Sequence, residues 1–160
     1  MAQNKKPWIA LAATNDLPIA RPPVDHLVKG IAEIREIQLP YKTLSTEDII
    51  FWTQQLHGAE GILLRSGYIT EKFLEYLPKI KIIAVHGTGV DPVDLNACTE
   101  RQIYVTNTPG ANADAVTEIT IGLMLSLARQ IPSSAFQVKQ NLAWDNIFSA
   151  ETFMHYKPDP

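Results

Sequence analysis

Short runs of apolar residues alternate along this chain with longer segments in which apolar and polar residues recur at helical spacing. Five of the runs have the length of strands: Trp8 to Ala13, Ile34 to Leu39, Gly61 to Arg65, Ile80 to Val85 and Ile103 to Thr106. Nearly continuous apolar strands separated by helices are typical of a parallel sheet that is covered on both faces. The pattern therefore predicts an α/β fold with five parallel strands.

Capping residues mark where helices between these strands begin and end. Ser45 offers a cap and is followed by acidic residues, while Gly58 suits a left-handed helix terminus, so we expect a helix near 46–57. Asp91 followed by Pro92 pairs a capping side chain with proline at the first helical position, which predicts a second helix from Pro92. Right-handed crossovers then give a doubly wound, flavodoxin-like sheet whose ligands bind at the carboxyl ends of the strands.

A long helix is expected from Ala113 to Gln130, because apolar residues lie on nearly every side of it. Such a helix is buried by its neighbours. We expect this domain to cover one flank and a second domain or subunit to cover the other. The predicted organisation is a domain over 1–110, a connecting and dimerisation helix over 111–131, and a tail over 132–160.

Composition and charge narrow the function. The 160 residues are 46% hydrophobic, and 14 basic residues against 17 acidic ones give a formal charge of −3. No basic patch points to nucleic acid, and no apolar run approaches the roughly 20 residues that span a membrane. The single cysteine, Cys98, has no partner or metal-ligand spacing, so we interpret it as a packing residue and expect a cytoplasmic protein.

The sequence Gly87-Thr88-Gly89, here called the glycine loop, comes where a strand is expected to pass into a helix. Consecutive backbone N–H groups at such a point can bind an anion such as a carboxylate. The alternative is a tight turn without a ligand, which the spacing alone favours. The loop is no dinucleotide fingerprint, because the third glycine would fall at Pro92.

Three further positions are candidates for substrate binding. Arg65 closes the third predicted strand and Ser66 continues into the turn, so both are expected at the same sheet edge as the glycine loop, where a guanidinium can bind an acid. An arginine bonded to loop carbonyls is an equal alternative. Asn112 either caps the long helix, which is the better expectation in isolation, or contacts substrate. His86 also lies near this edge, but it is more typical of a structural histidine than of a general acid.

The order and spacing of these motifs resemble the D-2-hydroxyacid dehydrogenase family, from the first strand to about Arg129. The residues that carry the resemblance are Leu77 to Ile83, Gly87 to Asp91, Val105 to Gly110, Asn112 and Glu118 to Arg129.

The resemblance implies a reversible, NAD- or NADP-dependent reduction of a small 2-oxo acid to a 2-hydroxy acid. It implies that backbone N–H groups at Thr88 and Gly89 bind the substrate carboxylate, and that Arg65 lies at the substrate. The position of Asn112 borders substrate and nicotinamide in some members. The helix over 113–130 implies a homodimer interface.

The chain departs from the family at three points. Pro92 replaces an asparagine, Thr117 replaces an alanine, and the nucleotide domain expected after Tyr156, with its glycine fingerprint and catalytic arginine, glutamate and histidine, is not in the sequence. We therefore expect no tight cofactor binding and no catalysis by this chain alone, and assign no catalytic, cofactor-binding or metal-ligating residue. The alternative is a non-catalytic dimerising or small-acid-sensing module that pairs with an intact relative through 113–130.

Overall fold

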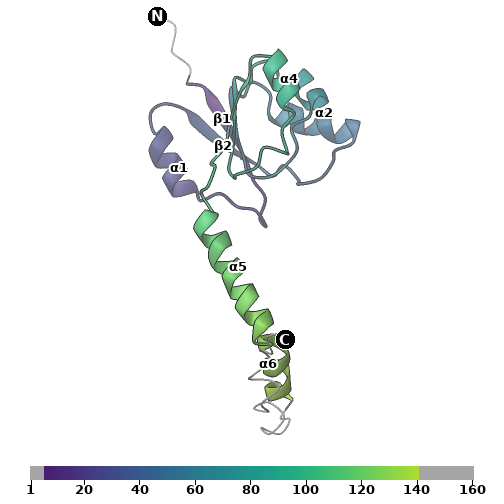
Figure 1. Cartoon of the computed structure of the whole chain (residues 1–160). Coiled ribbons are helices and arrows are strands. Elements are labelled where there is room, and N and C mark those ends of the chain that lie inside the picture. Colours follow the sequence, from purple (N-terminus) through teal and green to yellow (C-terminus); the bar gives the residue numbers. More distant parts are fainter. Residues whose placement is uncertain (1–5, 141–160) are drawn as a thin grey trace, which may run out of the picture. The chain divides into compact units, whose positions relative to one another are not determined.

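The computed structural model of the chain describes residues 6–140 (Figure 1). In it, five parallel strands form one sheet in the order β2-β1-β3-β4-β5. The predicted α/β, doubly wound fold class is confirmed, and each predicted strand ends within two residues of the observed one. The strands are β1 (Trp8–Ala12), β2 (Glu33–Ile37), β3 (Gly61–Leu64), β4 (Ile82–Val85) and β5 (Tyr104–Thr106).

Six helices follow or connect these strands among the described residues. They are α1 (Arg21–Val28), α2 (Thr46–Gln55), α3 (Glu71–Glu75), α4 (Leu95–Glu100), α5 (Ala113–Ala128) and α6 (Ile131–Lys139). The predicted cap of α2 is present: the Asp48 N–H donates to the Ser45 hydroxyl, and the Asp48 carboxylate accepts from the Ser45 N–H. Gly58 has φ of 82°, as a left-handed terminus requires.

The core lies on both faces of the sheet because successive strand residues point to opposite sides. Ala10 and Ala12 of β1 belong to the larger cluster, which side chains from α2, α3 and α4 complete. Leu11 belongs to a smaller cluster on the other face, where Val24 of α1 packs. Cys98 is buried in α4 within the larger cluster and is free, as expected of a packing residue.

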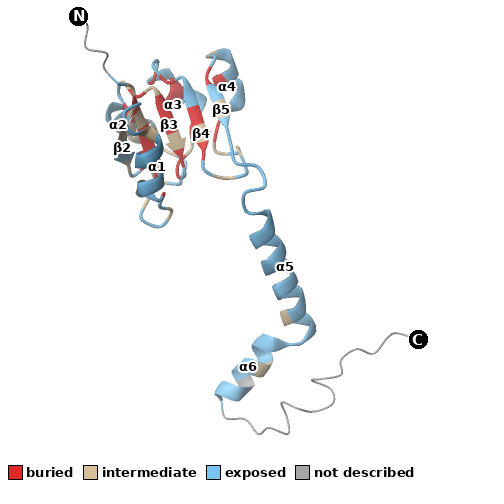
Figure 2. Cartoon of the chain, turned by 90° about the vertical axis from the view of Figure 1, so that its left-hand side faces the viewer, coloured by how far each residue is buried: buried red, intermediate tan, exposed pale blue. Residues whose placement is uncertain are grey.

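Residues Met1–Ala111 and Asn112–Pro160 form two compact units. In the second unit, none of the residues of α5 is buried (Figure 2). Its interface role stays a prediction. Helix α6 was not predicted from the sequence. Its Pro132 occupies the first turn, where a missing N–H costs little. The part of the predicted tail after residue 140 lies outside the described residues.

Among residues 6–140, no helix has the combined length and apolar character needed to cross a membrane.

Candidate active site

Strands β3 and β4 end side by side, and this brings two candidate residues together. Leu64 is paired with Val85, and the His86 N–H continues the ladder by donating to the Leu64 carbonyl at 2.8 Å. The next residue of β3 is Arg65, whose Nη1 donates to the His86 carbonyl at 3.3 Å. Arg65 therefore lies at the start of the glycine loop, as the sequence predicted, and it also makes the loop-carbonyl contact of the alternative interpretation.

The carbonyl groups of the glycine loop are fixed by two residues that follow β5. The Gly87 carbonyl accepts hydrogen bonds from the Thr108 N–H at 2.9 Å and the Thr108 hydroxyl at 3.0 Å. The Thr88 carbonyl accepts from Nδ2 of Asn107 at 2.7 Å. Both segments follow neighbouring parallel strands, β4 and β5, so they emerge at the same sheet edge.

These bonds determine where the N–H groups of the loop point. The peptide bonds described are trans, and in a trans peptide the N–H is antiparallel to the C=O. Because the carbonyls of Gly87 and Thr88 face Asn107 and Thr108, the N–H groups of Thr88 and Gly89 face the other way. Within residues 6–140 neither N–H has a hydrogen-bond acceptor. Two adjacent donors without a partner are available to an anion.

The helix predicted to begin at Pro92 begins instead at Leu95, so this prediction was wrong. Asp94 caps α4, its carboxylate accepting from the Ala97 N–H at 3.0 Å. The reason is nonlocal: Ile69 forms a parallel bridge with Val93, and residues 90–93 form a hydrogen-bonded turn in place of the first turn of a helix. Because α4 starts several residues after the glycine loop, the N–H groups of the loop do not lie at the start of a helix, where the sequence had predicted them.

Asp91, freed from capping, lies beside the glycine loop. A Cβ built on Gly89 would lie 2.8 Å from Oδ2 of Asp91, so this carboxylate covers one side of Gly89. Gly87 has open space at the same position. The loop is thus open to a ligand on one side and has a negative charge on another.

Ser66 is almost fully buried, and its hydroxyl donates to the Leu39 carbonyl at 2.5 Å. This contact joins the loop after β3 to the loop after β2. It gives the Ser66 side chain a structural use that the sequence analysis did not foresee. Substrate contact by Ser66 stays a prediction.

Asn112 occupies the position before α5, where its carbonyl accepts from the Val116 N–H at 2.9 Å. Its side chain makes no capping hydrogen bond, so the expectation that it caps the helix was wrong. The backbone explains this, because φ of −115° and ψ of 12° differ from the extended conformation of a capping residue. Its amide is therefore not committed to the helix.

Two tyrosines lie at the same sheet edge in the loops after β2 and β3. The rings of Tyr41 and Tyr68 stack with centroids 4.9 Å apart and planes 30° apart. A hydrogen bond with Tyr41, followed by desolvation, raises the pKa of Tyr68 above its ordinary value. The sequence analysis did not select this pair.

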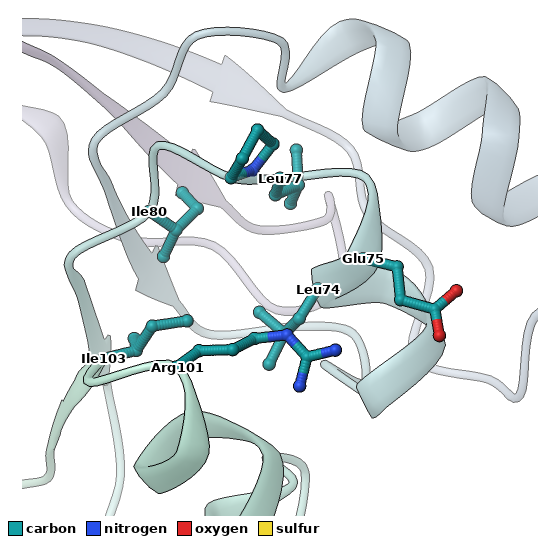
Figure 3. Close-up of a pocket in the computed structure, with 7 residues that line it drawn as sticks. Leu74, Glu75, Leu77, Ile80, Arg101 and Ile103 are labelled. Atoms are coloured by element: carbon teal, nitrogen blue, oxygen red, sulfur yellow. The ribbon is translucent and has the colours of Figure 1, made fainter.

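A hollow of about 440 Å³ lies at the opposite edge of the sheet (Figure 3). Its lining includes Leu77 and Ile80, which precede β4, and Arg101 and Ile103, which precede β5. It is therefore separate from the glycine loop, which follows β4.

The fold and the loop define the class of this protein: a doubly wound α/β domain with backbone donors at the carboxyl edge of its sheet. Residues 14–155 match the family described as D-isomer specific 2-hydroxyacid dehydrogenase, catalytic domain. The chain belongs to this family, as the sequence resemblance implied.

Individual relatives agree with this assignment. The D-3-phosphoglycerate dehydrogenase of Methanocaldococcus jannaschii is 34% identical over 119 residues, which are 74% of this chain and 22% of that enzyme. The NAD⁺-bound 3-phosphoglycerate dehydrogenase of Entamoeba histolytica is 30% identical with a TM-score of 0.58, over 76% of this chain and 39% of that one. The NADPH-dependent glyoxylate/hydroxypyruvate reductase of Sinorhizobium meliloti, solved with citrate, is 26% identical with a TM-score of 0.65, over 85% and 39%. The chain thus spans about a fifth to two fifths of these relatives' length.

Proposed function

We propose that this chain is the substrate-binding part of an NAD(P)-dependent D-2-hydroxyacid dehydrogenase, an oxidoreductase that reduces a 2-oxo acid to a 2-hydroxy acid. The observation that carries the proposal is the pair of free N–H groups at Thr88 and Gly89, with the Arg65 guanidinium at the start of the same loop. Family membership supports the reaction class.

The proposed role of these residues is to bind and orient the acid. The two N–H groups donate to the substrate carboxylate, and Arg65 adds a charge-assisted contact. Fixing the carboxylate leaves the neighbouring carbonyl carbon free to accept hydride. Asn112 is a further proposed contact that rests on the resemblance alone.

The nicotinamide supplies the hydride when it is bound, but the glycine loop does not fit a dinucleotide. Pro92 occupies the position of the third glycine, and α4 begins only at Leu95. We therefore assign the cofactor no residue here and propose that these 160 residues do not catalyse hydride transfer alone. The choice between NAD and NADP is left unassigned, and a cytoplasmic location belongs to the proposal.

An NMR titration of the ¹⁵N-labelled chain with glyoxylate tests the binding role. We expect the amide signals of Thr88 and Gly89 to shift, with a dissociation constant on the order of 1 mM for so few contacts. Arg65→Gln should weaken binding by at least about tenfold, since charged hydrogen bonds contribute roughly 1.5–3 kcal/mol. Arg21→Gln is the matched control, because Arg21 pairs with Asp25 on α1. Unshifted loop amides, or equal affinities of the two variants, would refute the proposal.

A second candidate role follows from α5, which exposes large apolar residues around its circumference. They include Ile119, Leu123, Met124 and Leu127, each at least 60% exposed. Apolar surface of this kind is typical of an interaction site, here a homodimer or a pairing with an intact relative. In this role the domain senses a small acid without catalysis. Co-purification of a mixed dimer with a full-length dehydrogenase would support it, and a strictly aggregated isolated chain would count against it.

A further inference from the structure

The charge of the proposed substrate can be inferred from the loops at the carboxyl edge of the sheet. These loops cover residues 13–20, 38–45, 65–70, 86–94 and 107–112. Their lysine and arginine side chains are Lys42 and Arg65, and their acidic side chains are Asp16, Asp91 and Asp94. The acidic groups outnumber the cationic ones, so this edge provides no positive field for a multiply charged anion.

The two cations differ in what they already contact. Nζ of Lys42 lies 4.0 Å from Oδ2 of Asp48, at the start of α2. Lys72, on the neighbouring α3, is also engaged there, since its Nζ donates to the Thr46 hydroxyl at 2.6 Å. Arg65 contacts only a neutral carbonyl among the bonds described, so it is the cation available to a ligand. One guanidinium and two N–H groups match a single carboxylate.

No further cation lies in the loop that carries Arg65, which covers residues 65–70. Tyr68 follows Arg65 by three residues in the same loop, and its ring stacks on Tyr41. The Ser66–Leu39 hydrogen bond holds the two loops together. Phenol rings offer apolar faces and neutral hydroxyl groups, which suit an uncharged substrate substituent and leave a phosphate without a cationic partner.

We propose that the acid bound here carries its carboxylate as its only anionic group, so that the substrate class is an unphosphorylated 2-oxo or 2-hydroxy acid. This inference rests on the proposed function of the glycine loop. The proposed substrate therefore differs from the phosphorylated substrate that the names of the phosphoglycerate dehydrogenase relatives give.

The test compares D-glycerate with D-3-phosphoglycerate, which differ by one phosphate, in titrations of the full ¹⁵N-labelled chain at fixed ionic strength. Binding is read from the amide signals of Thr88 and Gly89. We expect D-3-phosphoglycerate to bind no more tightly than D-glycerate, because a phosphate that finds no cation gains little at physiological salt. His86→Arg is the designed gain of function, since the exposed His86 is adjacent to the glycine loop. It should tighten phosphoglycerate binding about tenfold and change glycerate binding less than threefold.

The outcomes separate the two proposals. Tenfold tighter binding of phosphoglycerate by the unaltered chain would overturn the substrate class and leave the carboxylate site standing. A His86→Arg variant without phosphate preference would also contradict the charge argument. If neither acid shifts the amides of Thr88 and Gly89, the proposed function itself fails.

Discussion

Replacing Gly67 by alanine should destabilise the fold through a steric overlap with Leu39, and the cost of this overlap can be measured separately from the cost of backbone strain. Gly67 has φ of 104°, and an added Cβ would overlap the side chain of Leu39, which is fully buried. Gly30 has φ of 83°, but an added Cβ there meets open space. Gly30→Ala is therefore the control that introduces a strained φ without a clash.

The expected magnitudes follow from these two terms. A non-glycine residue in this backbone region costs on the order of 1–3 kcal/mol. Overpacking a buried side chain adds typically about 1–3 kcal/mol. We therefore expect Gly67→Ala to lower the free energy of unfolding by about 1–3 kcal/mol more than Gly30→Ala does.

Urea unfolding followed by circular dichroism measures this difference, with the slope against denaturant checked for constancy in both variants. Equal losses of unfolding free energy would show that Leu39 moves aside without cost, and that the loops after β2 and β3 are not packed against each other as described.

Three other changes probe the site and the core. Ser66→Ala should lower the free energy of unfolding by about 1–3 kcal/mol, because its buried carbonyl partner loses its donor; a smaller loss in urea unfolding would contradict this. Asn107→Ala should weaken glyoxylate binding about fivefold by releasing the Thr88 carbonyl, whereas the exposed control Asn96→Ala should not, as calorimetric titration would show. Burial, and secondarily a nearby carboxylate, raises the pKa of Cys98. Its contribution to stability is therefore complete below about pH 8.5, the ordinary thiol value, and is lost as pH rises through the raised pKa. Unfolding measured from pH 7 to 10 should show this loss, and a Cys98→Ala variant should not.

The central strands β1 and β3 could be predicted because burial on both faces requires apolar runs, and such runs are visible locally. The start of α4 could not, although Asp91-Pro92 has the right residues for it. The competing interaction, the bridge between Ile69 and Val93, joins residues that are far apart in the sequence. Local propensity was overridden by a tertiary contact.

The candidate site divides in the same way. The position of Arg65 beside the glycine loop follows from strand order, because parallel neighbours end at one edge. The Ser66 hydroxyl binds the Leu39 carbonyl, which is 27 residues away in the sequence. The Asn107 side chain binds the Thr88 carbonyl, which is also far away in the sequence. Asn107 and Thr108 follow β5, the neighbour of β4, and this placement indicated that they lie near the glycine loop. Which carbonyl groups of the loop they bind could not be predicted from the sequence.

The hydrogen bonds that Asn107 and Thr108 donate to the glycine loop have a consequence for folding. Asn107 and Thr108 follow β5, the last strand and an edge of the sheet, so the donor geometry of the loop exists only after that strand has docked. An acid bound at the proposed site should therefore stabilise the docked strand and slow amide exchange in β5, although the proposed site contains no residue of that strand.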